Sequence, residues 1–222
     1  MRKFKKIAAG AAAGEPPLRR PARRRFLAGL TTLGLAGATL AAGRVRANRP
    51  PDASPLAEAF TWAASPIPVP DTAFLTADGG ETTLAAFRGR TVLLNFWATW
   101  CAPCVREMPS LDRLQARLKG EGLEVVAVSE DFAGIDLVQP FFKRLKLETL
   151  EIFLDDRGAL AKAFGIAGLP TTLLIDRAGR MVGGLEGPAE WDSDDAVALI
   201  RHYLRQPGDG PEQRPGDTPE ET

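Results

Sequence analysis

The chain has 222 residues, of which 45% are hydrophobic and 25% are charged. This composition excludes a collagen-like chain, an acidic disordered chain and a polytopic membrane protein. The formal net charge of zero conceals a split, because residues 1–47 carry eleven basic residues and one acidic residue. That segment is therefore +10 and the rest of the chain is −10, which predicts a targeting or membrane segment joined to a separate domain.

Residues 1–47 have the layout of an export signal. Three arginines that end at Arg25 are followed by an uncharged stretch over residues 26–43 and by small side chains around Ala47. A basic region, an apolar region and a cleavage site in this order are typical of a signal peptide. The string Arg23-Arg24-Arg25-Phe26-Leu27 also resembles a twin-arginine signal, which implies export to the periplasm.

The alternative for residues 26–43 is an uncleaved anchor in the inner membrane, because eighteen uncharged residues lie at the lower edge of what spans a bilayer. Either interpretation places the rest of the chain outside the cytoplasm. An apolar run directly behind the arginines contacts no phosphate, so we expect no nucleic-acid partner.

The remaining chain is predicted to divide into three parts. Residues 48–64 are rich in proline and alanine and predict a linker. Residues 207–222 include seven prolines or glycines and no large apolar side chain, which predicts a disordered tail. Residues 65–206 between them are enough for one domain with its own core.

Within this domain, hydrophobic periodicity predicts strands that alternate with helices. The predicted elements are a hairpin over 73–83 that turns at Asp78-Gly79-Gly80, a buried strand over 91–97, a helix over 102–118, a buried strand over 123–128, a helix over 136–147 with Pro140 in its first turn, a strand over 151–154, a helix over 159–164, strands over 171–175 and 181–185 joined by a turn, and a last helix over 193–205. This order predicts an α/β fold.

The two cysteines, Cys101 and Cys104, stand at the junction of the first buried strand and its helix. A disulfide that closes so short a loop restrains the unfolded chain little, so a purely structural bond is disfavoured. Zinc needs about four ligands and His202 is the only histidine, so we expect no metal site and no cofactor. Redox chemistry fits better, because the start of a helix stabilises a thiolate on Cys101.

The stretch NFWATWCAPCVREMP, together with GLPTTLLID and GPAEWDS, resembles the TlpA/ResA-like thiol:disulfide reductases of the thioredoxin superfamily. The resemblance implies a thioredoxin fold, in which helices flank a central mixed sheet. It also implies an N-terminal hairpin extension and a central insertion over residues 135–160. We expect Phe96 and Trp97 to belong to the core.

In such a reductase Cys101 is the nucleophile that attacks a substrate disulfide, and Cys104 then resolves the mixed disulfide. Pro103 suits the first turn of the helix, where its missing N–H costs nothing. By resemblance, Trp100 shields one side of the disulfide. Pro170 is the cis-proline that faces it and leaves the backbone before it free to pair with a substrate strand.

Two positions differ from ordinary thioredoxin. Thioredoxin has a buried aspartate as proton carrier where this chain has Asn95, which cannot take up a proton. Glu107 lies one helical turn beyond Cys104, and in the resembling reductases a glutamate here adjusts the cysteine pKa values. We predict that Glu107 is the proton relay for Cys104, with a solvated surface acid as the alternative. Trp191 and Asp192 are expected to pack and cap the last helix.

The resemblance implies an exported reductase of protein disulfides in cytochrome c or cytochrome oxidase maturation. Its substrates would be apocytochrome c cysteines or the copper-site cysteines of cytochrome oxidase assembly, and a membrane thiol-transfer protein would supply electrons. A disulfide oxidase or isomerase is an alternative of the same class. A copper-binding assembly chaperone is an alternative of another class, because two thiols are soft ligands, although such chaperones use a wider cysteine spacing and a nearby histidine.

Overall fold

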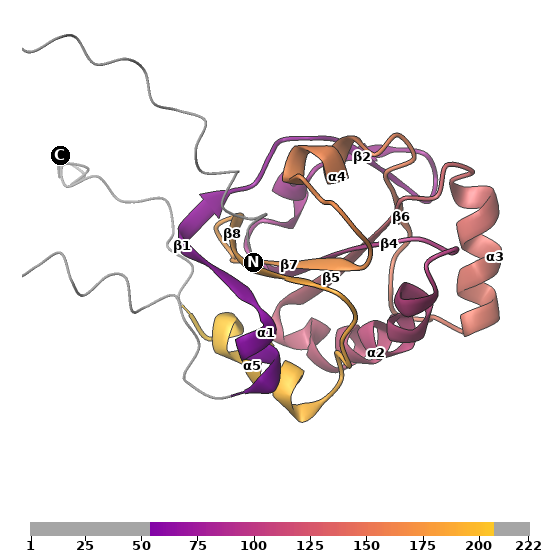
Figure 1. Cartoon of the computed structure of the whole chain (residues 1–222). Helices are drawn as coiled ribbons and strands as arrows, with labels where there is room; N and C mark the ends of the chain where they lie inside the picture. The colour runs from indigo at the N-terminus through magenta and orange to yellow at the C-terminus, as the bar shows by residue number, and fades with distance from the viewer. Residues whose placement is uncertain (1–53, 207–222) are drawn as a thin grey trace, which may run out of the picture. The chain divides into compact units, whose positions relative to one another are not determined.

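A central sheet with helices on both faces is formed by residues 54–206, the part of the chain that the computed structural model describes (Figure 1). The sheet has eight strands in the order β1-β8-β7-β4-β5-β6-β2-β3. The strands are β1 (Thr61–Pro68), β2 (Phe74–Thr76), β3 (Glu81–Thr82), β4 (Thr91–Trp97), β5 (Leu123–Ser129), β6 (Phe153–Leu154), β7 (Thr171–Ile175) and β8 (Arg180–Glu186). The α-helices are α1 (Pro55–Ala59), α2 (Ala102–Leu118), α3 (Ile135–Leu145), α4 (Ala159–Phe164) and α5 (Asp194–Leu204), and two short 3₁₀ helices are η2 (Leu84–Phe87) and η3 (Lys119–Glu121).

The centre of the sheet is mixed, as the predicted α/β thioredoxin fold requires. Strand β4 runs parallel to β5 and antiparallel to β7, and β7 is antiparallel to β8. All seven residues of β4 are buried, because helices cover both faces of the strand. The β4–β7 register pairs Asn95 with Thr172, which brings two buried polar residues together in the middle of the sheet.

Alternate residues of β4 face two different core layers. Trp97 packs against Phe141 and Phe142 of α3 on the face that α2 also covers. Phe96 points to the other face and packs against Phe164 of α4. Both residues are therefore core, as the sequence predicts, and Asn95 shares the α2 face with Trp97.

The predicted hairpin is confirmed as β2 and β3, which pair antiparallel. The helix and strand of the central insertion are α3 and β6. Strand β6 pairs parallel with β5 and antiparallel with β2, so the hairpin and the insertion together extend one edge of the sheet.

Two expectations about local structure were wrong. Residues 54–64, expected within a linker, form α1 and the start of β1, because Trp62 stacks on Phe60 and on Tyr203 and secures this segment to α5. Pro140 lies in the middle of α3 rather than in its first turn. The packing of the buried α3 residues on Trp97 outweighs the hydrogen bond that proline removes.

The predicted export signal, the first part of the predicted linker and the predicted C-terminal tail lie outside residues 54–206. Within that described range, no helix is long and apolar enough to cross a membrane.

Candidate active site

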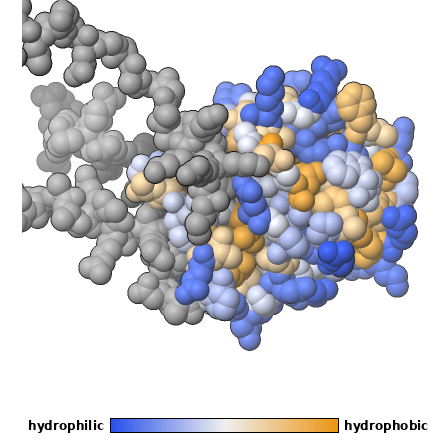
Figure 2. Space-filling view, in the orientation of Figure 1, coloured by the Kyte–Doolittle hydropathy of each residue, from blue (hydrophilic) through white to orange (hydrophobic). Residues whose placement is uncertain are grey.

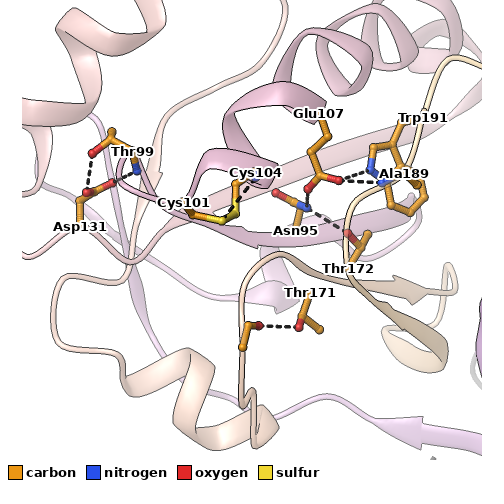
Figure 3. The surroundings of a disulfide bond; sticks show 11 residues. Asn95, Thr99, Cys101, Cys104, Glu107, Asp131, Thr171, Thr172, Ala189 and Trp191 are labelled. Atoms are coloured by element: carbon orange, nitrogen blue, oxygen red, sulfur yellow. Dashed lines mark hydrogen bonds between the residues drawn. A yellow bond between two sulfur atoms is a disulfide. The ribbon is translucent and has the colours of Figure 1, made fainter.

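The two cysteines form a disulfide at the start of α2 (Figure 3). Cys101 is the N-cap residue of the helix, and its sulfur accepts a hydrogen bond from the backbone N–H of Cys104 at 3.3 Å. The N-terminal N–H groups and the helix dipole favour negative charge here, so the position stabilises a thiolate on Cys101. Cys101 is 6% exposed and Cys104 is fully buried, so Cys101 is the sulfur that a substrate reaches first.

The residues beside the cysteines lie where the sequence places them. Pro103 is in the first turn of α2, where no intrahelical partner for its N–H is lost. Trp100 is 70% exposed, so its ring is available at the surface next to Cys101.

The Leu169–Pro170 peptide bond is cis, as the resemblance predicts. Pro170 directly precedes β7, and Thr171 at the start of β7 pairs with Phe96 near the end of β4. The cis-proline therefore lies at the same edge of the sheet as the loop that leads to Cys101. The hydroxyl of Thr171 donates to the Gly168 carbonyl at 2.7 Å and holds this turn.

Glu107 is buried, with only 2% of its surface exposed, so the alternative of a solvated surface acid is wrong. Its Oε1 accepts a hydrogen bond from Asn95 Nδ2 at 2.9 Å. Asn95 Nδ2 also donates to Thr172 Oγ1 at 2.9 Å, which fixes the amide between the strand and the helix. Figure 3 shows Asn95 between the disulfide and Glu107.

Burial raises the pKa of Glu107, and hydrogen bonds from Asn95, Ala189 and Trp191 act in the opposite direction. A buried carboxyl group one helical turn beyond Cys104, whose pKa is raised by burial, is a candidate for proton transfer. The Ala189 and Trp191 contacts come from a loop more than eighty residues away in the chain. The sequence predicted Trp191 only as a packing residue, because no local pattern reveals so distant a contact.

Asp131 was not predicted, and it holds the loop before the cysteines. The buried carboxylate accepts hydrogen bonds from the Thr99 N–H at 2.8 Å, the Thr99 hydroxyl at 2.7 Å and the Ser129 hydroxyl at 2.7 Å. In Figure 3, Thr99 and Asp131 lie on one side of the disulfide, and Asn95 and Glu107 lie on the other side. The signal for Asp131 was its place just after β5, where the ends of adjacent parallel strands meet.

Two aromatic side chains project from the segments that Asp131 joins. Trp100 follows Thr99, and Phe132, which is 90% exposed, follows Asp131. Both rings are therefore exposed on the two segments that Asp131 joins. In residues 54–206, no group of three or more His, Cys, Asp or Glu side chains is placed to hold a metal ion.

A thioredoxin-type sheet, a redox-capable cysteine pair at a helix start and a cis-proline at the same edge define a thiol-disulfide oxidoreductase. The chain belongs to the Redoxin family, which matches residues 63–200.

Comparisons with individual proteins agree with this class. The thiol-disulfide oxidoreductase ResA of Bacillus thuringiensis subsp. konkukian is 35% identical over 129 residues, which cover 58% of this chain and 70% of that protein. ResA of Geobacillus thermodenitrificans is 38% identical over 112 residues, or 50% of this chain and 63% of that protein. The crystal structure of a putative thiol:disulfide interchange protein DsbE from Chlorobium tepidum matches with a TM-score of 0.57 and 30% identity, covering 63% of this chain and 96% of that one.

Proposed function

We propose that this oxidoreductase works as an exported reductase of protein disulfides. Its targets would be the cysteine pairs of apocytochrome c or of the copper-site proteins of cytochrome oxidase assembly. The observation that supports the proposal most is the buried Glu107, held by Asn95 one helical turn beyond Cys104. A reductase needs such a base, because its second cysteine must lose a proton before it can attack.

In the first step the Cys101 thiolate attacks one sulfur of the target disulfide. A mixed disulfide forms between Cys101 and the target, and the other target sulfur leaves as a thiolate that takes a proton from solvent. The helix start favours this step, because it stabilises the thiolate on Cys101.

In the second step Cys104 gives its proton to the Glu107 carboxylate and attacks the Cys101 sulfur. The bond between Cys101 and the target breaks, and the second target sulfur leaves as a thiolate and is protonated. The Cys101–Cys104 disulfide seen in the structure is the product of this step. The target has gained two electrons, and a membrane thiol-transfer protein returns two electrons to the enzyme.

The surroundings of the disulfide support a polypeptide target. Trp100 and Phe132 present apolar rings on two segments that Asp131 ties together. The backbone before Pro170 is suited to pair with an extended target segment. Residues 1–47 would deliver the domain to the periplasm, through a twin-arginine signal or as an anchor over residues 26–43.

The proposal is tested by trapping targets with Cys104→Ala in the native organism and fractionating the cells. Because this variant has no internal disulfide, it captures a target only when Cys101 attacks an oxidised cysteine pair. We expect mixed disulfides with exported proteins that contain cytochrome c or copper-site cysteines. The matched control is Cys101→Ala/Cys104→Ala, which should capture nothing. A Cys104→Ala protein that stays in the cytoplasm, or that accumulates without mixed disulfides, would contradict the proposal.

A further inference from the structure

The loop between β8 and α5, residues 187–193, reaches back to the Glu107 side chain. The backbone N–H of Ala189 donates to Glu107 Oε2 at 3.0 Å, and the indole Nε1–H of Trp191 donates to the same oxygen at 3.1 Å. Both oxygens of the carboxylate are therefore held, because Oε1 accepts from Asn95. Figure 3 shows Asn95 on one side of the carboxylate and Ala189 and Trp191 on the other.

Further hydrogen bonds fix this loop to the turn of α2 that carries Glu107. The backbone N–H of Trp191 donates to Ser110 Oγ at 3.1 Å, and the Ser110 hydroxyl donates to the Glu107 carbonyl at 2.7 Å. One turn further along the helix, Arg113 forms an ion pair with Asp192. The position of the indole relative to the carboxylate is thus set by both the loop and the helix.

The indole contact favours one protonation state of Glu107. An indole N–H can only donate, so it stabilises an oxygen that carries negative charge. Burial opposes this effect and raises the pKa of Glu107, and the negative charge of Glu190 on the same loop raises it further. The neighbours from the sheet, Asn95 and Thr172, are neutral, and the Asp192–Arg113 pair neutralises itself nearby.

We propose that Trp191 is a positioning residue of the exchange reaction, whose indole N–H holds the Glu107 carboxylate in the ionised form that accepts the Cys104 proton. This inference rests on the proposed role of Glu107 and adds the residue that keeps that role available. It gives the buried tryptophan a task beyond packing.

The packing role of Trp191 can be perturbed separately from its hydrogen bond. Phe60, which follows α1, packs edge-on against the Trp191 ring with centroids 6.3 Å apart and planes at 88°. Phe60→Leu therefore disturbs the packing of the ring and leaves the indole N–H in place. Trp191→Phe removes the N–H and keeps an aromatic ring.

The test is the pH profile for reduction of a small disulfide by the reduced full-length protein and its variants. Each limb of this profile is a range of pH over which the rate changes as one group titrates. The limb that belongs to Glu107 is the one that disappears in Glu107→Gln. In Trp191→Phe the same limb should move to higher pH by about one unit, since a hydrogen bond to a charged group is worth roughly one to two pKa units. Phe60→Leu should lose stability without moving the limb, and adding Trp191→Phe to Glu107→Gln should shift nothing.

The outcomes separate the inference from the proposed function. If Glu107→Gln removes the limb and Trp191→Phe leaves it in place, the role of Trp191 is overturned and that of Glu107 stands. If Phe60→Leu moves the limb as far as Trp191→Phe, packing accounts for the effect and the inference fails. If Glu107→Gln changes no limb, the relay itself is wrong.

A second replacement covers the case in which Trp191→Phe does not fold. Benzothienylalanine incorporated at position 191 keeps the bicyclic ring and lacks the N–H donor. The carboxyl carbon signal of Glu107, followed by NMR as a function of pH, should then titrate at higher pH than in the native protein. An unchanged titration in this variant would overturn the inference.

Discussion

Glu130, directly after β5, carries a carboxyl group whose pKa is raised by the fold. Burial and the negative charges of Asp155 and Asp131 raise the pKa of Glu130 to about 8. Asp155 is held at the start of α4, because its two carboxylate oxygens accept hydrogen bonds from the backbone N–H groups of Ala159 and Ala161. Because hydrogen bonds to α4 hold Asp155 in place beside Glu130, the fold favours the protonated form of Glu130.

This proton links the stability of the fold to pH. The pKa of Glu130 is higher in the folded chain than in the unfolded chain, so its stabilising contribution is complete below its ordinary value near 4.5 and is lost as pH rises to about 8. Glu130→Gln stays neutral and should flatten this dependence. Between pH 5 and pH 9 we expect the native protein to lose about 1–2 kcal/mol more than the variant, a value discounted for solvent screening of a partly exposed group.

Urea unfolding of the oxidised protein at several pH values measures this difference. Glu151→Gln removes a carboxylate at an exposed position and serves as the matched control, which should follow the native curve. Parallel curves for the native protein and Glu130→Gln would show that folding does not raise the pKa of Glu130, and would contradict the prediction.

At the scale of elements, β1 packs closely on β8 at a glycine, Gly183, which pairs with Trp62. The Trp62 ring of β1 lies over Gly183, and a Cβ atom there would stand 2.7 Å from Trp62 Cε3 and 3.2 Å from the Thr61 carbonyl. Alanine in a strand is otherwise better than glycine by roughly 0.5–1 kcal/mol. The overlap with a ring held between Phe60 and Tyr203 outweighs that gain.

We therefore expect Gly183→Ala to lower the free energy of unfolding by about 1–3 kcal/mol, as overpacking does in other cores. Denaturant unfolding measures the loss. Gly120→Ala is the control, because nothing lies within 4 Å of its Cβ position. Adding Trp62→Leu should remove most of the cost of Gly183→Ala. A Gly183→Ala protein as stable as the native one would mean that β1 adjusts freely.

The same segment shows what could be predicted from the sequence and what could not. Local sequence patterns predict the buried strand β4, the cysteine pair at the start of α2 and Pro103 in its first turn, because each depends on residues close in the chain. The fit of Trp62 over Gly183 and the bond from Trp191 to Glu107 join residues more than eighty positions apart. No periodicity encodes such contacts, which is why residues 54–64 looked like a linker.

At the scale of the whole molecule, the described domain is acidic although the full chain is neutral. Residues 54–206 contain 21 acidic and 15 basic residues, while residues 1–47 carry the +10 charge. Figure 2 shows hydrophilic residues over much of one face of this domain, with hydrophobic residues in patches between them. A domain of this charge attracts basic targets over distances of about the Debye length.

This charge predicts which target segments are reduced fastest. Two oxidised peptides, identical except for lysines or glutamates beside the disulfide, should be reduced at rates that differ by about tenfold at low ionic strength, because like charges slow association and opposite charges speed it. The advantage of the lysine peptide should shrink as salt rises to about 0.5 M, where screening shortens the range of the field to a few Å. A serine-flanked peptide is the control and should be insensitive to salt. Equal rates for the two charged peptides at low salt would mean that contacts at Trp100 and Phe132, rather than the charge of the domain, govern the choice of target.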